Sequence, residues 1–290
     1  MHRPLVIFGL AMAALSLVTG AALLIDDRTL DGMPLWAKPL KFAVSFTIYS
    51  FTWAWLLSLR KGKGRWGHRA GTILAVTGAA EVAVILAQAA RVRHSHFNVA
   101  TPLDLTLWVG MGVTIAVLLL ANIAAAVAVL LDRPADRPLA RAIGAGLIVS
   151  TIGLALGGLM AFPAEGQEGD LMGAHSVGLP DGGAGLPVLG WSTLAGDLRV
   201  PHFVGMHALQ ILPLLAPLTR KLHDTVRLRL IVVGGAGYTA LLALLTWQAL
   251  RGQSIVRPDA LTLTVAAALA VAVVSAALAA LRLPTLEKSR

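Results

Sequence analysis

The sequence contains no cysteine, which excludes disulfides, thiolate metal sites, iron–sulfur clusters and cysteine nucleophiles. Charged residues are also scarce, since they make up 13% of the 290 residues, against about 25% in a soluble domain. Hydrophobic residues make up 57% of the chain, and the mean hydropathy is +0.75. Because so little polar surface remains to cover a water-soluble globule, the composition predicts that lipid covers much of the protein.

Several standard catalytic signatures are missing as well. The sequence has no Gly-rich phosphate loop of the Walker type, no His-Glu-x-x-His and no Gly-x-Ser-x-Gly. The net charge of +9 does not indicate nucleic-acid binding, because the basic residues stand in short loops between apolar runs and act there as topology signals. We therefore expect the lipid bilayer, and no nucleic acid, as a partner.

Apolar stretches long enough to span a bilayer recur along the whole chain. We predict one all-α domain over residues 1–290, a polytopic transmembrane bundle of about eight helices, because a lipid-exposed segment must satisfy its own backbone hydrogen bonds. The first apolar run is longer than the core of a signal peptide, so we expect it to be retained. The predicted helices are roughly 4–25, 39–59, 71–92, 105–131, 142–162, 202–219, 228–250 and 260–281.

The orientation follows from the basic residues. Most of the 24 Lys and Arg residues fall at the termini and in alternate connections, which the positive-inside rule places in the cytoplasm. Many acidic residues, most histidines and the longest connection, 163–201, then lie on the extracytoplasmic side. We predict a multi-pass protein of a bacterial inner membrane, with both termini cytoplasmic and its polar chemistry on the outer face.

Two lysines begin the second predicted helix, in the run from Trp36 to Phe42. Lys38 and Lys41 are candidates for binding an anionic headgroup, ligand or cofactor. The alternative is that both lysines snorkel to the interface beside a Trp anchor, as is common near helix ends.

A polar stripe runs outward along the third predicted helix. Glu81 lies near mid-membrane, where a carboxylate is costly and is by default a functional candidate; the alternative is a structural hydrogen bond to a neighbouring helix. Gln88 and Arg91 follow on nearly the same face. The candidate catalytic residues are Glu81, Ser95 and Asp104, and the candidate ligand-binding residues of this region are Gln88, Arg91 and Asn98.

The segment 196–210 brings further polar residues to the start of the sixth predicted helix. His202 lies in the first turn with His207 and Gln210 deeper, and Asp197 and Arg199 precede them. Arg199 and Gln210 are the candidate ligand-binding residues of this segment. His202 and His207 are about 140° apart on an ideal helix, so they are not a simple pair of ligands.

Imidazoles and carboxylates on one membrane face suit Zn, Fe, Mn or Cu, and facing imidazoles suit haem b. The preferred ligands are His96, His202 and His207, with His94, His175, Asp104 and Asp197 as reserves. The alternative is that these histidines only hydrogen-bond loops at the interface.

Our leading hypothesis is a metal or haem site open to the extracytoplasmic face, in a metalloenzyme or redox protein acting on a lipid-like or anionic small molecule. A second hypothesis is a proton-coupled transporter with a midplane site at Glu81 and Gln88. A third is a non-catalytic structural or sensory membrane protein.

The runs Trp36–Phe42, Gln88–Arg91 with Ser95–Asn98, and Gly196–Arg199 with His202–Gln210 resemble a family of uncharacterised bacterial multi-pass membrane proteins. This resemblance implies the membrane fold and no mechanism. A looser similarity, in chemistry only, is to the zinc hydrolases of the alkaline ceramidase and adiponectin-receptor superfamily. There Ser95, His96 and Asp104 would match the early residues, and His202 and His207 the late pair. Helix number, late-His spacing and membrane side depart from that pattern.

Overall fold

The computed structural model describes residues 1–62, 64–132, 134, 136–162 and 169–283. These residues confirm the predicted all-α bundle. The eight α-helices are α1 (Arg3–Ile25), α2 (Ala37–Ser58), α3 (Arg65–Ala90), α4 (Pro102–Leu131), α5 (Arg137–Leu156), α6 (Arg199–Leu218), α7 (Asp224–Leu250) and α8 (Ala260–Arg282). A 3-10 helix, η1 (Gly157–Ala161), continues α5. Four short strands lie in the connections: β1 (Thr29–Leu30), β2 (Met33–Pro34), β3 (Ser176–Val177) and β4 (Gly196–Asp197).

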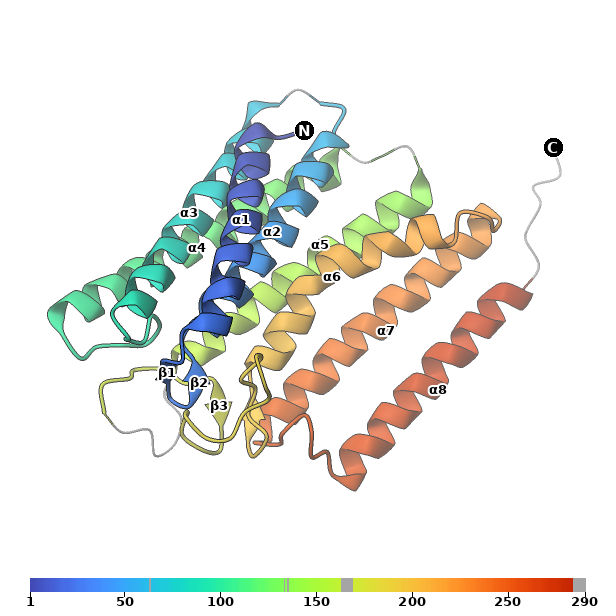
Figure 1. Cartoon of the computed structure of the whole chain (residues 1–290). Coiled ribbons are helices and arrows are strands. Elements are labelled where there is room, and N and C mark those ends of the chain that lie inside the picture. Colours follow the sequence, from blue (N-terminus) through green and yellow to red (C-terminus); the bar gives the residue numbers. More distant parts are fainter. Residues whose placement is uncertain (63, 133, 135, 163–168, 284–290) are drawn as a thin grey trace.

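Seven helices of the described chain are long and apolar enough to cross a membrane, which makes this an integral, multi-pass membrane protein. The helix outside that group is α6, whose hydropathy is lowered by one arginine, two histidines and a glutamine. Helix α6 runs beside α5 (Figure 1), and one of these polar side chains, His202, bonds to the backbone of α5 at Gly153.

Several helices begin before the predicted apolar stretch. Thus α3 begins at Arg65 and not at residue 71, and α5 begins at Arg137 and not at residue 142. The side chain of Asp136 caps α5 by accepting a hydrogen bond from the backbone N–H of Leu139 at 3.1 Å. Helical hydrogen bonding therefore continues into polar turns that hydropathy alone leaves out.

The helices form two groups (Figure 1). Helices α1 to α4 pack together, and α5 to α8 follow one another as a splayed row, with α8 at its outer edge. The N-terminus of α1 lies at the same end as the last turn of α8 and the connections that follow α2, α4 and α6. We call this the basic end, and the opposite end, with the connections 26–36, 91–101, 169–198 and 251–259, the histidine end.

Helices α5 and α6 approach each other most closely at Gly153 and Gly205. A Cβ added at Gly153 would lie 2.3 Å from the carbonyl carbon of Gly205, so only glycine allows this crossing. Small residues permit such close backbone contact in membrane bundles. This contact fixes the position of the first turns of α6 along α5.

The connections at the histidine end cover the bundle. Strands β1 and β2 form a hairpin, in which Asp31 (φ 50°) and Gly32 (φ 73°) take the left-handed conformations of a tight two-residue turn. Strand β3 pairs with β4, and Asn98 forms an isolated bridge with Leu171. Residues 163–168 of the predicted long connection lie outside the described residues, whereas 169–198 folds onto the end of the bundle.

Candidate functional site

His96 follows α3 and is enclosed by aromatic rings from three elements. Its Nδ1 lies 3.0 Å from the Oγ of Ser95, a buried hydroxyl. The ring centroids of Phe42 on α2 and Trp108 on α4 lie 5.8 and 5.9 Å from that of His96. Burial, with the charges of Lys38 and His175, lowers the pKa of His96 well below its usual value, so this imidazole is neutral at pH 7.

The backbone after His96 is strained. Phe97 has φ 66°, a left-handed conformation that is unfavourable for a bulky side chain. Packing holds it there, since the buried ring lies 4.9 Å from that of Trp108 and 5.1 Å from that of His175, centroid to centroid. The ring of this strained residue therefore lies near both imidazoles, with its centroid 6.0 Å from that of His96 and 5.1 Å from that of His175.

His175 is held by a carboxylate that sequence reasoning missed. Its Nδ1 donates to Asp181 at 2.6 Å, and the backbone N–H groups of His175 and Ser176 donate to the same carboxylate. Burial lowers the pKa of His175 although the hydrogen bond to Asp181 raises it. Burial opposes ionisation of Asp181, but the hydrogen bonds from His175 and Ser176 outweigh it and lower the pKa of the carboxyl. An Asp six residues after a His in a Gly-rich segment was a weak signal for this pair.

His202 is held by backbone. In the first turn of α6, its Nδ1 donates to the carbonyl oxygen of Gly153 on α5 at 2.8 Å. The imidazole also lies against Gly157 of η1, where an added Cβ would come within 2.8 Å of its Cε1.

These three imidazoles and Lys38 form what we call the histidine–lysine cluster. His96 interacts electrostatically with Lys38, His175 and His202, and His175 does so with Lys38. All four side chains are half-buried. Each imidazole uses Nδ1 for a protein partner, whereas its Nε2 makes no hydrogen bond to another described residue. The cluster thus joins α2, α6 and two connections of the histidine end, and its remaining polar atoms have no hydrogen-bond partner among the described residues.

Lys38 differs from the other cations around it. Within the described part of the chain, its ammonium makes no salt bridge or hydrogen bond, although it interacts electrostatically with Asp181 and Glu81. Lys41 donates to the carbonyl oxygen of Leu189 at 2.8 Å. Arg199 forms a salt bridge of 2.6 Å with Asp197, whose side chain is fully buried. Of the predicted ligand-binding cations Lys38, Lys41 and Arg199, Lys38 is therefore the one left to bind a ligand in this region of the described chain.

The polar stripe of α3 builds the 91–101 connection. Gln88 donates to Asp104 at 2.9 Å and to the carbonyl oxygen of His94 at 3.0 Å. Arg91 forms a 2.9 Å salt bridge with Asp104, and Asn98 donates to the His94 carbonyl at 3.1 Å. These side chains, predicted as catalytic or ligand-binding, are joined to one another and position Ser95 and His96.

Glu81 lies deeper on α3 and is 2% exposed. Its carboxylate accepts a hydrogen bond from the hydroxyl of Thr114 on α4. Its electrostatic interaction with Lys38 links the buried carboxylate to the histidine–lysine cluster.

Two predicted ligands lie apart from the cluster. The Nδ1 of His207 contacts the Oε1 of Gln210 at 3.2 Å, and Gln210 donates to Thr52 on α2 at 3.4 Å. His94 pairs with Asp31 of the β1–β2 turn at 3.1 Å. His207 and His202 lie on different faces of α6, as their spacing of five residues indicated.

The predicted metal ligands do not converge in this arrangement. Among the described residues, no three His, Asp or Glu side chains lie close enough together to hold one ion. Metal or haem binding, by His96, His202 and His207 or by the reserve ligands, therefore stays a prediction.

Sequence reasoning also missed a polar centre inside the bundle. The Oδ1 of Asn122 on α4 accepts hydrogen bonds from Tyr49 at 2.8 Å and from Trp53 at 3.2 Å, both on α2. Its amide donates to Thr151 on α5 at 3.2 Å. A single Asn within the apolar run 105–131 was a signal that could have found it, because buried polar groups in membranes need partners.

Comparison of the chain with family models, curated proteins and solved structures gives no match. The functional argument therefore rests on the geometry of the histidine–lysine cluster.

Proposed function

We propose that the histidine–lysine cluster binds an anionic, oxygen-rich group, of the phosphate or carboxylate class, at the histidine end of this membrane protein. The observation that carries the proposal is the ammonium of Lys38, which has no hydrogen bond or salt bridge within the described chain and interacts electrostatically with His96 and His175. A half-buried cation without a partner is unfavourable, and an anionic oxygen would supply the missing hydrogen bonds.

The neighbouring cations support this assignment to Lys38. Four arginines at the histidine end are each neutralised by a carboxylate, in the pairs Arg28–Asp26, Arg91–Asp104, Arg199–Asp197 and Arg251–Asp259. Those pairs stabilise the connections and neutralise the charge of these four arginines. Lys38 combines charge, partial burial and free donors.

The imidazoles contribute hydrogen-bond acceptors. Because a carboxylate and a carbonyl can only accept, Nδ1 of His175 and of His202 carries the proton, and the neutral rings keep a lone pair at Nε2. Such lone pairs accept from a hydroxyl of a bound phosphate or carboxylic acid. Burial lowers the pKa of His96 and His175, so these rings are neutral acceptors at pH 7 and take up a proton only at lower pH.

Titration calorimetry of the purified protein in mild detergent tests the proposal, with inorganic phosphate and dihexanoyl phosphatidic acid as probes. The Lys38→Gln variant is expected to bind the preferred probe about ten- to a hundredfold more weakly, the effect of losing a charge-assisted hydrogen bond. Arg93→Gln is the matched control, because Arg93 is exposed at the same end. An equal loss in both variants, or no binding of either probe to the unsubstituted protein, would contradict the proposal.

A second candidate function is a transition-metal or haem site on the imidazoles. It is favoured by their Nδ1 contacts, since metal-ligating histidines commonly donate the other ring N–H to a carboxylate or carbonyl, as His175 and His202 do. The imidazoles would have to move closer, and Lys38 disfavours an added cation. Elemental analysis and an absorption spectrum of one sample test this candidate. Near-stoichiometric metal or a Soret band that is lost in His202→Ala but kept in His207→Ala would support it.

The transporter hypothesis depends on Glu81. Its interaction with Lys38 is the observation in favour, whereas Gln88 is occupied by the 91–101 connection. Loss of proton-coupled uptake in Glu81→Gln, with phosphate binding retained, would favour it.

A further inference from the structure

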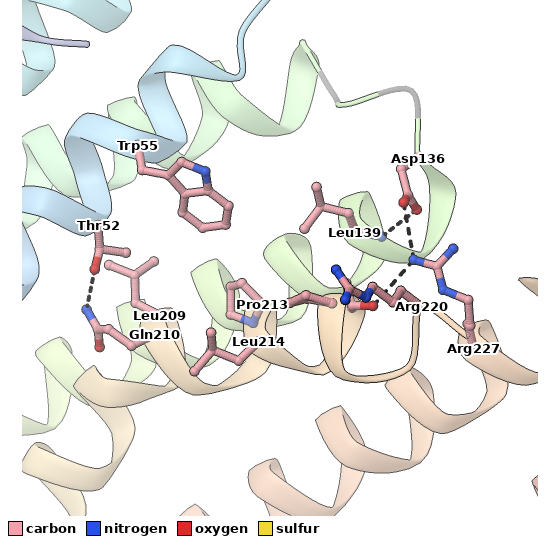
Figure 2. A pocket seen from close by; sticks show the side chains of 12 residues that line it. Thr52, Trp55, Asp136, Leu139, Leu209, Gln210, Pro213, Leu214, Arg220 and Arg227 are labelled. Carbon is pink, nitrogen blue, oxygen red and sulfur yellow. Dashed lines mark hydrogen bonds and ion pairs between the residues drawn. The ribbon is translucent and has the colours of Figure 1, made fainter. Parts of the chain in front are cut away.

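A cleft lies toward the basic end, between α2 and α6, well away from the histidine–lysine cluster. It has a volume of about 420 Å³, within the range of roughly 300–1,000 Å³ of small-molecule pockets. Figure 2 shows its two ends: the Thr52–Gln210 hydrogen bond closes one, and Arg220 and Arg227 stand at the other. Trp55 and Leu214 lie between them, 37% and 56% exposed.

The cleft opens between two helices of the membrane bundle. Trp55 is on α2, a helix apolar and long enough to cross a membrane, and Leu214 is on the neighbouring α6. An opening between these helices faces hydrocarbon, so a lipid chain is the molecule that reaches it at highest concentration. The lining is mostly apolar, as an acyl chain requires.

The charged end carries unused hydrogen-bond donors. Arg227 is 9% exposed and bonds to Asp136 at 3.2 Å and to Asp224 at 2.8 Å, yet its Nε has no hydrogen-bond partner in the described chain. Arg220 is exposed, and no salt bridge joins its guanidinium to another described residue. Guanidinium groups match phosphate geometry, and basic pockets between transmembrane helices bind anionic lipid headgroups.

We propose that this cleft binds an anionic phospholipid from the leaflet at the basic end. Its phosphate lies against Arg220 at the end of the cleft that Arg227 also lines, and one acyl chain lies along Trp55, Pro213 and Leu214. The site is independent of the histidine–lysine cluster, and either proposal can fail alone.

Tryptophan quenching in nanodiscs tests this site. Full-length protein is placed in phosphatidylcholine nanodiscs that contain a fixed fraction of brominated-chain phosphatidylglycerol or of brominated-chain phosphatidylcholine. The contribution of Trp55 is the difference between the unsubstituted protein and Trp55→Phe. If Trp55→Phe does not fold, Trp55→Tyr serves in its place. We expect brominated phosphatidylglycerol to occupy the cleft about fivefold in preference to phosphatidylcholine, the effect of one basic side chain near the surface.

The Arg220→Gln variant should lose this preference, and Lys221→Gln, an exposed neighbour outside the cleft, should keep it. Equal quenching by both lipids would overturn the proposal, because it indicates ordinary boundary lipid. Absence of quenching would also overturn it, because it would show that no lipid chain reaches Trp55. If free inorganic phosphate abolishes the preference, the site takes the ion and not the lipid. An equal loss in Lys221→Gln would show a general charge effect and contradict the assignment to Arg220.

Discussion

The imidazole of His202 donates from Nδ1 to the carbonyl oxygen of Gly153 at 2.8 Å, across the contact between α6 and α5. Because the carbonyl can only accept, this bond fixes the ring tautomer and leaves the Nε2 lone pair free. Gly153 is also the residue at which the backbone of α6 comes closest to α5. One contact therefore sets both the helix packing and the chemistry that His202 presents.

The Gly153→Ala substitution should strongly destabilise the protein. The new Cβ would lie 2.3 Å from the carbonyl carbon of Gly205, and backbone atoms cannot rotate away as a side chain can. We expect a loss of at least about 1–3 kcal/mol, the usual effect of overpacking, measured as the apparent Tm in detergent. Gly110→Ala is the control, since a Cβ there meets nothing within 4 Å. Equal Tm values for the two variants would contradict the described crossing.

The Asn122→Ala substitution should destabilise the protein more than Tyr49→Phe does. In Asn122→Ala, the hydroxyl of Tyr49 and the indole N–H of Trp53 both lose their acceptor. A buried polar group left unsatisfied costs about 1–3 kcal/mol. Tyr49→Phe removes one donor and leaves Asn122 its bonds to Trp53 and Thr151, so its effect should be smaller. Apparent Tm values in the opposite order would show that Asn122 does not hold α2, α4 and α5 together.

Stability should fall in mild acid because of His96. Its pKa is lowered in the folded protein from the ordinary value of 6.5, so below pH 6.5 the unfolded chain binds more protons and unfolding becomes easier. The stabilisation is fully present above pH 6.5 and is lost as the pH falls. Lys38 on α2, His175 in the 169–198 connection and His202 on α6 face the ring and disfavour its charged form.

In His96→Gln, the decrease of apparent Tm between pH 6.5 and 3.8 should be shallower, though not absent, because the pKa of His175 is lowered too. Titration of Asp181 does not contribute to the change in stability over this pH range. Its lowered pKa gives stability that is lost only as the pH falls below its ordinary value of 3.8. An unchanged slope in His96→Gln would show that the imidazole is not desolvated in the folded protein.

Hydropathy predicted the membrane helices well, because apolar runs of spanning length have few other uses. It could not predict α6 as clearly, since Arg199, His202 and Gln210 in that helix are explained by their bonds to Asp197, to Gly153 on α5 and to Thr52 on α2. The histidines were recognised as candidates by their residue type. Their grouping was not predictable, because it depends on the strained backbone at Phe97, on the fold of 169–198 and on the Gly153–Gly205 crossing. For the same reason, the sequence alone could not distinguish a ligand-binding Lys38 from a snorkelling cation. The distinction depends on its interactions with His96 and His175, which only the structure shows.

The most direct test of the central claim is whether an anion contacts the Lys38 ammonium. Lysines methylated reductively with ¹³C give separate NMR signals, and the Lys38 signal is assigned by its absence in Lys38→Arg. On titration with inorganic phosphate, the Lys38 signal should shift with saturation, while that of Lys61 at the basic end stays in place. A Lys38 signal that does not move, or that moves only in parallel with the other lysines, would contradict a binding site at the histidine–lysine cluster.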